Sequence, residues 1–132
     1  MVVANKQVDE DGFMKKVFIL SMFFCMGTAT LIAGEANVVN VNVQRSGDSY
    51  RFDVTVLHQD AGWKHYADKW DVVSEDGTVL GTRVLYHPHV DEQPFTRSLS
   101  GVEIPEAVKT ITVRAHDSVH GYGGNTMSVE IK

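Results

Sequence analysis

The sequence predicts an all-β fold, namely a single antiparallel β-sandwich of about seven strands that follows an N-terminal signal peptide. Apolar and polar residues alternate in short runs after position 38, which is typical of strands with one buried face. Turn residues separate these runs, and no stretch of ten or more residues after position 36 has helical periodicity. A separate apolar run near the start of the chain predicts the signal peptide.

The N-terminal apolar run has the layout of a secretory signal peptide, which we place at residues 14–36. Two lysines follow Met14, apolar residues extend over 17–33, and small residues at 34 and 36 provide a cleavage site after Ala36. An uncleaved membrane anchor is the alternative, because the run is about as long as the shortest helices that span a bilayer. The predicted location is therefore periplasmic or secreted, without membrane contact after cleavage.

These boundaries divide the chain into an upstream extension at residues 1–13, the signal peptide at 14–36 and a β-sandwich domain at 37–132. The only cysteine, Cys25, lies in the signal peptide. The predicted domain therefore has no disulfide, no thiolate nucleophile and no cysteine metal ligand. A formal net charge of -5 offers no basic surface for a phosphate backbone, so nucleic acid is not an expected partner.

The first four strands are predicted as two hairpins. Residues 38–44 and 49–58 alternate valines and aromatic residues with polar ones, and a Ser-Gly-Asp turn separates them. Residues 69–74 and 78–87 follow the same pattern around an Asp-Gly turn. Both pairs are therefore expected to be antiparallel.

Three more strands are predicted at 95–104, 109–116 and 125–132, the first of them with weaker alternation. Trp70 opens the third strand of the chain, where sandwiches of the immunoglobulin and fibronectin type III kind often bury a tryptophan. The sequence therefore favours an immunoglobulin/fibronectin III-like β-sandwich with Trp70 in its core.

Two parts of this domain, DAGWKHYADKW continuing to GVEIP and then VRAHDSVHGYGG, resemble a family of short exported bacterial proteins of unknown function. The resemblance covers roughly Leu57 to Val129, and HPHVDEQPFTRSLSG is its most specific part. It implies an exported single-domain β protein and supplies no activity.

The predicted sandwich sends its histidines to one end. In such a sandwich the second, fourth and sixth strands finish at the end where the third begins. All six histidines of the chain lie in or beside the loops of that end. They are His58, His65, His87, His89, His116 and His120.

We expect this histidine cluster to bind a divalent transition metal. His87 and His89 project to one side of an extended segment, and Pro88 between them limits the backbone freedom lost on binding. Three or four imidazoles suit Zn(II) or Cu(II). Asp91 and Asp117 are placed to orient a ring or to supply an oxygen ligand. The predicted ligands are His87, His89 and His116, with His120 or His58 in addition.

Other roles are open for the same histidines. Hydrogen-bonded histidines that hold loops are one alternative, and a proton-sensing cluster is another. His58 continues the inward alternation of its strand, so it is either a ligand or a core histidine. His65 has the surroundings of an exposed loop residue rather than a ligand.

Other functions find weaker support in the sequence. Ser118 beside Asp117 has the residue types of a hydrolase triad, and the glycines within residues 121–124 could offer backbone N–H groups for an oxyanion. Glycines in a hairpin loop usually only allow the turn, so we expect no catalysis. The acids near these loops lack the spacing of a calcium loop. Trp63, Tyr66 and Tyr122 are candidates for stacking on a glycan or anchoring a protein.

The predicted function is therefore that of an exported metal-binding protein, with zinc or copper(II) as its cofactor. The alternative is an immunoglobulin-like module that binds another periplasmic protein or a glycan and uses its histidines structurally.

Overall fold

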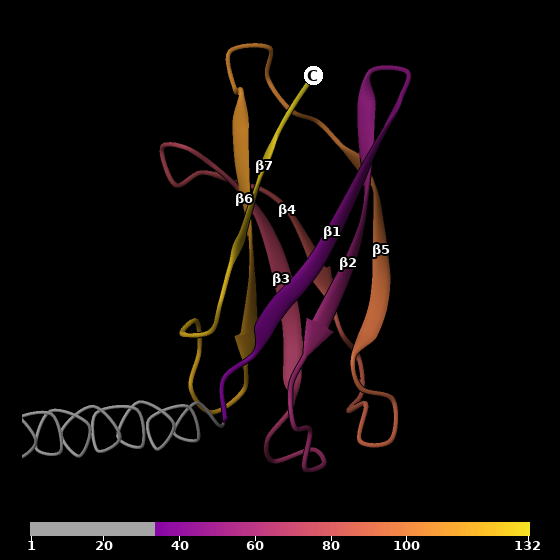
Figure 1. Cartoon of the computed structure of the whole chain (residues 1–132), viewed down its shortest axis with the longest axis vertical. Coiled ribbons are helices and arrows are strands. Elements are labelled where there is room, and N and C mark those ends of the chain that lie inside the picture. The colour runs from indigo at the N-terminus through magenta and orange to yellow at the C-terminus, as the bar shows by residue number, and fades with distance from the viewer. Residues whose placement is uncertain (1–33) are drawn as a thin grey trace, which may run out of the picture. The chain divides into compact units, whose positions relative to one another are not determined.

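The computed structural model describes residues 34–132, which form two antiparallel sheets (Figure 1). One sheet has the order β1-β2-β5 and the other β4-β3-β6-β7. The strands are β1 (Asn37–Ser46), β2 (Ser49–Leu57), β3 (Ala67–Ser74), β4 (Val79–Val84), β5 (Phe95–Val102), β6 (Thr110–Asp117) and β7 (Met127–Glu130). The prediction of a sandwich of seven antiparallel strands is confirmed. Its closer likeness to immunoglobulin or fibronectin type III domains stays a prediction.

Period-two alternation explains which side chains form the core. In β2, Phe52, Val54 and Val56 are fully buried, whereas the residues between them are partly or fully exposed. Trp70 of β3 is fully buried in the same cluster, as predicted. Burying an apolar side chain of this size contributes about 1.5–3 kcal/mol, so these residues supply much of the stability of the fold.

Strand β1 departs from simple alternation near its start. Its pairing with β2 shifts between Val38 and Asn40, as in a β-bulge. Val38 is therefore buried, whereas Val39 is 42% exposed. Beyond the bulge the alternation resumes, and Val41 and Val43 pack against the core.

Residues 34–36 pack with the sandwich, and we call them the entry segment. Ala36 is 1% exposed and belongs to the core, and the next residue but one, Val38, donates its N–H to the carbonyl of Asn125 at 2.8 Å. A Cβ on Gly124 would lie 1.9 Å from the carbonyl oxygen of Ala36, so only glycine fits there. The chain thus enters the fold against the β6–β7 connection.

The predictions for residues 1–13 and for Cys25 lie outside the described residues, as does most of the predicted signal peptide. Within residues 34–132 the structure contains no helix with the length and apolar character that crossing a membrane requires. The domain boundary at residue 37 and the cleavage after Ala36 stay predictions.

Candidate metal centre

Three connections gather at one end of the sandwich, which we call the loop pole (Figure 1). They are residues 58–66 between β2 and β3, 85–94 between β4 and β5, and 118–126 between β6 and β7. The six histidines of the chain lie in these connections or at the end of β6. The strand order therefore brings to one end residues as far apart in the sequence as His58 and His120.

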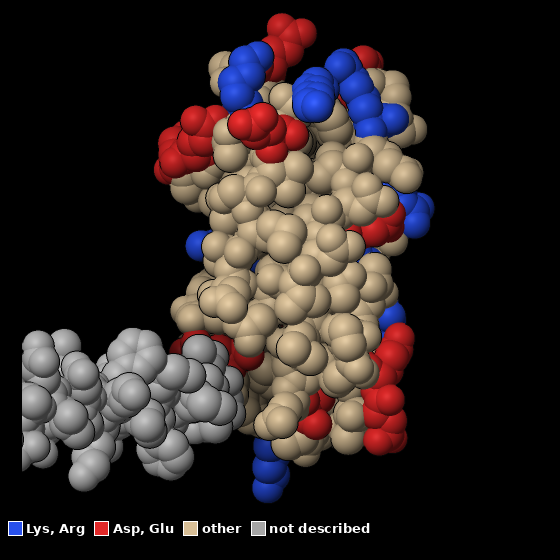
Figure 2. Space-filling model, in the orientation of Figure 1, with Lys and Arg blue, Asp and Glu red and all other residues tan. Residues whose placement is uncertain are grey.

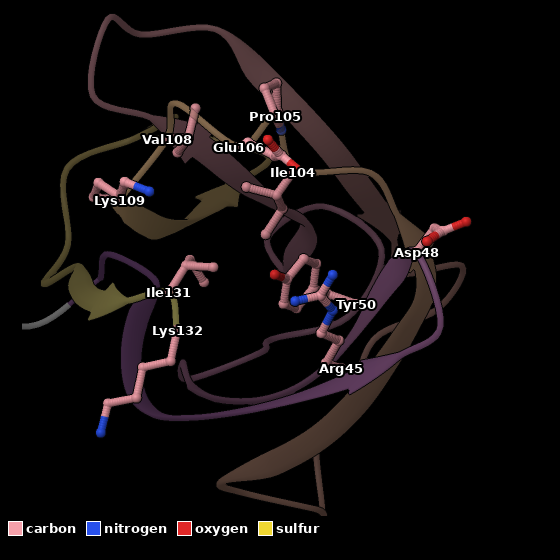
Figure 3. A pocket seen from close by; sticks show the side chains of 10 residues that line it. All are labelled: Arg45, Asp48, Tyr50, Ile104, Pro105, Glu106, Val108, Lys109, Ile131 and Lys132. Atoms are coloured by element: carbon pink, nitrogen blue, oxygen red, sulfur yellow. The ribbon is translucent and has the colours of Figure 1, made fainter.

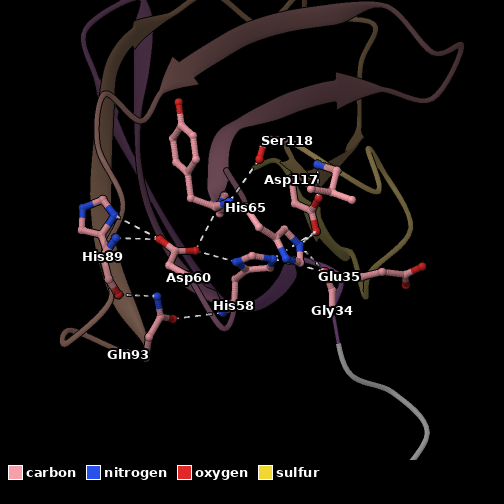
Figure 4. A network of polar contacts seen from close by, with 12 residues as sticks. Gly34, Glu35, His58, Asp60, His65, His89, Gln93, Asp117 and Ser118 are labelled. Carbon is pink, nitrogen blue, oxygen red and sulfur yellow. Dashed lines mark hydrogen bonds and ion pairs between the residues drawn. The ribbon is translucent and has the colours of Figure 1, made fainter. Parts of the chain in front are cut away.

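Asp117, the last residue of β6, is the centre of a polar cluster at the loop pole (Figure 4). Its Oδ1 accepts the backbone N–H groups of Val119 at 2.7 Å and His120 at 2.5 Å. Its Oδ2 lies 3.0 to 3.1 Å from one ring nitrogen each of His58, His65 and His120. Burial acts to raise the pKa of Asp117, but the hydrogen bonds from His120, Val119 and His65 outweigh it and hold the pKa well below its usual value. The buried carboxylate is therefore charged at neutral pH.

The ring of His58 is held by Asp60. His58 is 2% exposed, and its Nδ1 lies 2.5 Å from Oδ1 of Asp60. Asp60 is held in turn by the backbone N–H groups of Ala67 at 3.0 Å and His89 at 2.6 Å. A carboxylate on one ring nitrogen is the arrangement that orients a metal-binding histidine and strengthens it as a ligand. Because a carboxylate faces each ring nitrogen, a neutral His58 donates its one N–H group to one carboxylate and presents a lone pair to the other.

His65 and His120 complete the cluster on its solvent side. Their ring centroids lie 5.0 Å apart. The side chain of His65 is 26% exposed and that of His120 is 42% exposed, whereas those of His58 and Asp117 are fully buried. The hydrogen bond with Asp117 raises the pKa of His120, although burial acts to lower it. The cluster is thus buried on the side of His58 and Asp117 and open to solvent on the side of His65 and His120.

Gly34 of the entry segment adds a further oxygen to the cluster. Its carbonyl oxygen lies 3.2 Å from Nε2 of His58 and 3.2 Å from Nε2 of His65. Gly34 has a φ of +119°, and a Cβ there would lie 3.0 Å from Cε1 of His120. This position therefore requires glycine both for its backbone conformation and for space.

The two ring nitrogens of His58 face more acceptors than a neutral ring can satisfy. A neutral imidazole carries one N–H group, whereas Nδ1 of His58 faces Asp60 and its Nε2 faces Asp117 and the carbonyl oxygen of Gly34. One of the two nitrogens of a neutral His58 therefore directs a lone pair at a carboxylate. A cation among these atoms removes the conflict, as does a second proton that makes the ring cationic.

The geometry fits a small metal ion. Within residues 34–132, His58, His65 and Asp117 form a group whose ligand atoms all lie within 4.8 Å of one another. The nitrogen–oxygen separations of 3.0 to 3.2 Å are close to the ~3.3 Å edge of a tetrahedron with metal–ligand bonds of about 2.0–2.1 Å. The nitrogen–oxygen edges therefore match those of a zinc site, and the two imidazole nitrogens lie within 4.8 Å of each other.

His116, a predicted ligand, lies outside this group. Successive residues of a strand point to opposite faces, and in β6 Asp117 is buried whereas His116 is partly exposed. Nδ1 of His116 lies 2.6 Å from Oδ1 of Asp68, and its ring packs edge-on against Tyr122 at 4.7 Å. The pleat of β6 therefore separates His116 from its neighbour in the sequence.

His87 and His89 also lie outside the group. His89 is 5% exposed, stacks on Phe95 at 4.0 Å and has no hydrogen-bond partner for either ring nitrogen within the described residues. Burial lowers its pKa, so the ring is neutral at neutral pH. Its centroid lies 4.6 Å from that of His87, which is exposed, and Asp91 is exposed as well. The predicted role of these three residues as metal ligands or orienting groups stays a prediction.

The remaining candidate residues have separate surroundings. The hydroxyl of Ser118 accepts the backbone N–H of Tyr66 at 3.1 Å, and no histidine of the described residues hydrogen-bonds to it. Trp63 is 68% exposed and packs edge-on against the ring of Tyr66 at 5.7 Å. Tyr122 instead donates its hydroxyl to Oδ2 of Asp71 at 2.6 Å. Of the three predicted partner-binding aromatics, Trp63 is therefore the most available.

Three members of the cluster are missed by sequence reasoning. The expectation that His65 is an exposed loop residue is wrong, since its side chain is mostly buried and directed at Asp117 (Figure 4). Asp60 as a partner of His58 is missed as well, although the short His-x-Asp spacing was an available signal. Gly34 carries no such signal, because it lies in a segment that the sequence assigns to the signal peptide.

Comparisons with known proteins give one homologue. No known protein-family model matches the chain. A protein of Halomicrobium mukohataei named "Putative lipoprotein" is 45% identical over 104 residues, which are 78% of this chain and 51% of the relative. The chain thus spans about half the length of this relative.

Two solved structures resemble the chain distantly. A hypothetical protein from Pyrococcus horikoshii is 15% identical with a TM-score of 0.49, over 75% of this chain and 90% of that one. A superoxide reductase in its oxidised state is 12% identical with a TM-score of 0.49, over 76% and 91% of the two chains. Similarities with such low sequence identity and TM-score do not indicate a function.

Proposed function

We propose that this protein is an exported metal-binding protein that holds a divalent transition metal at the loop pole without catalysing a reaction. His58, His65 and Asp117 bind the ion, and His120 completes its surroundings. The carbonyl oxygen of Gly34 takes part only in a chain that keeps residue 34, which a cleavage after Ala36 would remove. The signal-peptide layout of the sequence and the name of the 45% identical relative support export.

One observation carries the metal proposal. Buried Asp60 holds one ring nitrogen of His58, and the other nitrogen faces the buried carboxylate of Asp117 at 3.0 Å. A histidine that only ties loops together needs one donor and one acceptor on its two sides. His58 has a carboxylate on both sides, which is the environment of a histidine that carries a positive charge or binds a cation.

The donor set favours zinc, with copper(II) as the second candidate. Imidazole nitrogens combined with carboxylate and carbonyl oxygens suit both ions. The separations described above match a tetrahedron, which zinc adopts readily, whereas copper(II) prefers a square-planar or tetragonal arrangement. Zinc is therefore the ion with which to begin.

A pair of histidine variants tests the site. We expect His65→Ala to lose zinc binding, because it removes a ligand that lies at the solvent side of the cluster. His87→Ala is the matched control, since His87 is exposed and lies outside the group. Isothermal titration calorimetry of the full chain, prepared without a histidine tag, measures both affinities.

The opposite result identifies a different site. If His87→Ala loses zinc binding while His65→Ala binds zinc as the wild type does, the metal site lies in the His87–His89 segment instead. Absence of binding by wild-type protein for both zinc and copper(II) would leave the histidines with a structural role, and the proposed function would be lost.

Glycan binding is the second candidate function. Trp63 and Tyr86 are 68% and 74% exposed in the connections of the loop pole, and exposed aromatic rings of this kind are typical of stacking surfaces. Because Trp70 is fully buried, a change in tryptophan fluorescence on adding soluble cello- or chito-oligosaccharides would come from Trp63. Unchanged fluorescence at millimolar sugar contradicts this function.

A further inference from the structure

A hollow of about 380 Å³ opens at the end of the sandwich opposite the loop pole (Figure 3). It lies between the end of β1, the connection from β5 to β6 and the residues after β7. None of the metal-centre residues lines it. A ligand in this hollow would therefore not contact the proposed metal site.

The floor of the hollow has an apolar part, although polar groups make up more of its exposed lining. Tyr50 is 9% exposed and belongs to the core, and Ile104, Val108 and Ile131 pack against that core. Figure 3 shows Tyr50 in the middle of the hollow, between Ile104 and Arg45. A small apolar body placed here would extend the core of the sandwich.

The rim of the hollow is charged. It carries three basic and two acidic side chains, which leaves one net positive charge, and Figure 2 shows both kinds gathered at this end. They are Arg45, Lys109, Lys132, Asp48 and Glu106. Within residues 34–132, none of the three basic groups forms an ion pair with a carboxylate, unlike Arg51, Arg97 and Arg114.

Arg45 is held in position over the apolar floor. Its Nε donates to the carbonyl of Gly47 at 3.1 Å, and its guanidinium carbon lies 5.8 Å from the ring centroid of Tyr50. The two terminal nitrogens then keep their hydrogens for a ligand. A guanidinium fixed in this way is suited to a planar or tetrahedral anionic group, because it donates two parallel hydrogen bonds.

We propose that this hollow binds a small organic anion. The anionic head, a carboxylate or a phosphate, is held by Arg45, and the apolar body lies against Tyr50, Ile104 and Ile131.

The test uses benzoate and phenyl phosphate as probes and benzyl alcohol as their neutral counterpart. Amide chemical shifts in the NMR spectrum of the full chain report where each probe binds. We expect benzoate to shift the amides around Tyr50 and Ile104 with saturation at millimolar concentration, and benzyl alcohol to do so at least about tenfold more weakly. Stronger binding of phenyl phosphate than of benzoate would assign the head as a phosphate, and weaker binding would assign it as a carboxylate.

Two substitutions locate the anion. Arg45→Gln should weaken benzoate binding about tenfold, whereas Arg51→Gln, which alters a residue paired with Asp53, should leave it unchanged. Tyr50→Leu tests the apolar floor, and its NMR spectrum shows whether the fold is retained. Equal binding of benzoate and benzyl alcohol, equal binding in Arg45→Gln, or no saturable shift near Tyr50 would each overturn the proposal.

Discussion

The proposed binding of a metal by His58 should depend on a residue that does not face the ion. Asp60 lies 2.5 Å from Nδ1 of His58 and is itself held by two backbone N–H groups. We predict that Asp60→Asn lowers the affinity for zinc about 10- to 100-fold, because an amide neither carries the charge nor favours the same ring tautomer. Titration calorimetry with zinc measures this change.

The control for Asp60→Asn is Asp53→Asn. Asp53 is partly exposed on β2, where it contacts Arg51 and Ser98 and no residue of the metal centre. This variant should bind zinc as the wild type does. If Asp60→Asn lowers the melting temperature of the metal-free protein while zinc affinity stays the same, Asp60 is purely structural and its assigned role is wrong.

At the scale of elements, the entry segment links the start of the described chain to the metal centre. We predict that Gly34→Ala weakens zinc binding, because Gly34 has a φ of +119° and a Cβ there would press on Cε1 of His120 at 3.0 Å. Gly77→Ala is the matched control, since Gly77 has a φ of +88° with nothing within 4 Å. Both variants carry similar backbone strain, so an equal loss of zinc affinity would rule out a specific role for Gly34.

The turn between β3 and β4 gives a prediction about acid. Asp76 accepts hydrogen bonds from the hydroxyl of Ser74 and from the N–H of Thr78, and these lower its pKa from 3.8 to about 2. Since the folded pKa lies below the unfolded value, the stabilisation is present above about pH 4 and is lost as the pH falls towards 2. We predict that the melting temperature of Asp76→Asn falls less steeply than that of the wild type across this window. Parallel melting curves by circular dichroism would contradict it.

The strands can be predicted from the sequence because alternation is a local signal, but the candidate metal centre can be predicted only in part. The sequence indicates His58, His120 and Asp117 and misses His65 and Gly34. Turn residues and period two locate β2 and β3 closely, whereas the bulge in β1 depends on its pairing with β2. Whether His116 or Asp117 faces the pole depends on the phase of β6, and a shift of one residue reverses it. His65 and Gly34 join the cluster through packing between distant segments, which no pattern within either segment encodes.

At the scale of the whole molecule, the two ends of the sandwich carry chemically different groups and share one core. The loop pole presents histidines around a buried carboxylate, and the opposite end presents basic groups around an apolar floor. No residue lines both places. Zinc binding and anion binding are therefore expected to be independent, so that saturation with one leaves the affinity for the other unchanged.

Zinc binding should also protect the entry segment against proteolysis. If the carbonyl of Gly34 contacts the ion, a protease that cleaves after glutamate reaches Glu35 only when that contact opens. Because His58, His65 and Asp117 still hold zinc when the segment opens, opening costs only the part of the binding free energy that Gly34 contributes, so cleavage after Glu35 should slow by at most about 100-fold at about 100 times Kd. Glu106 is the internal control, because it lies in the exposed β5–β6 connection, away from the loop pole. Mass spectrometry of timed digests separates the two cuts, and an unchanged rate at Glu35 in zinc-saturated protein would show that the entry segment is no part of the site.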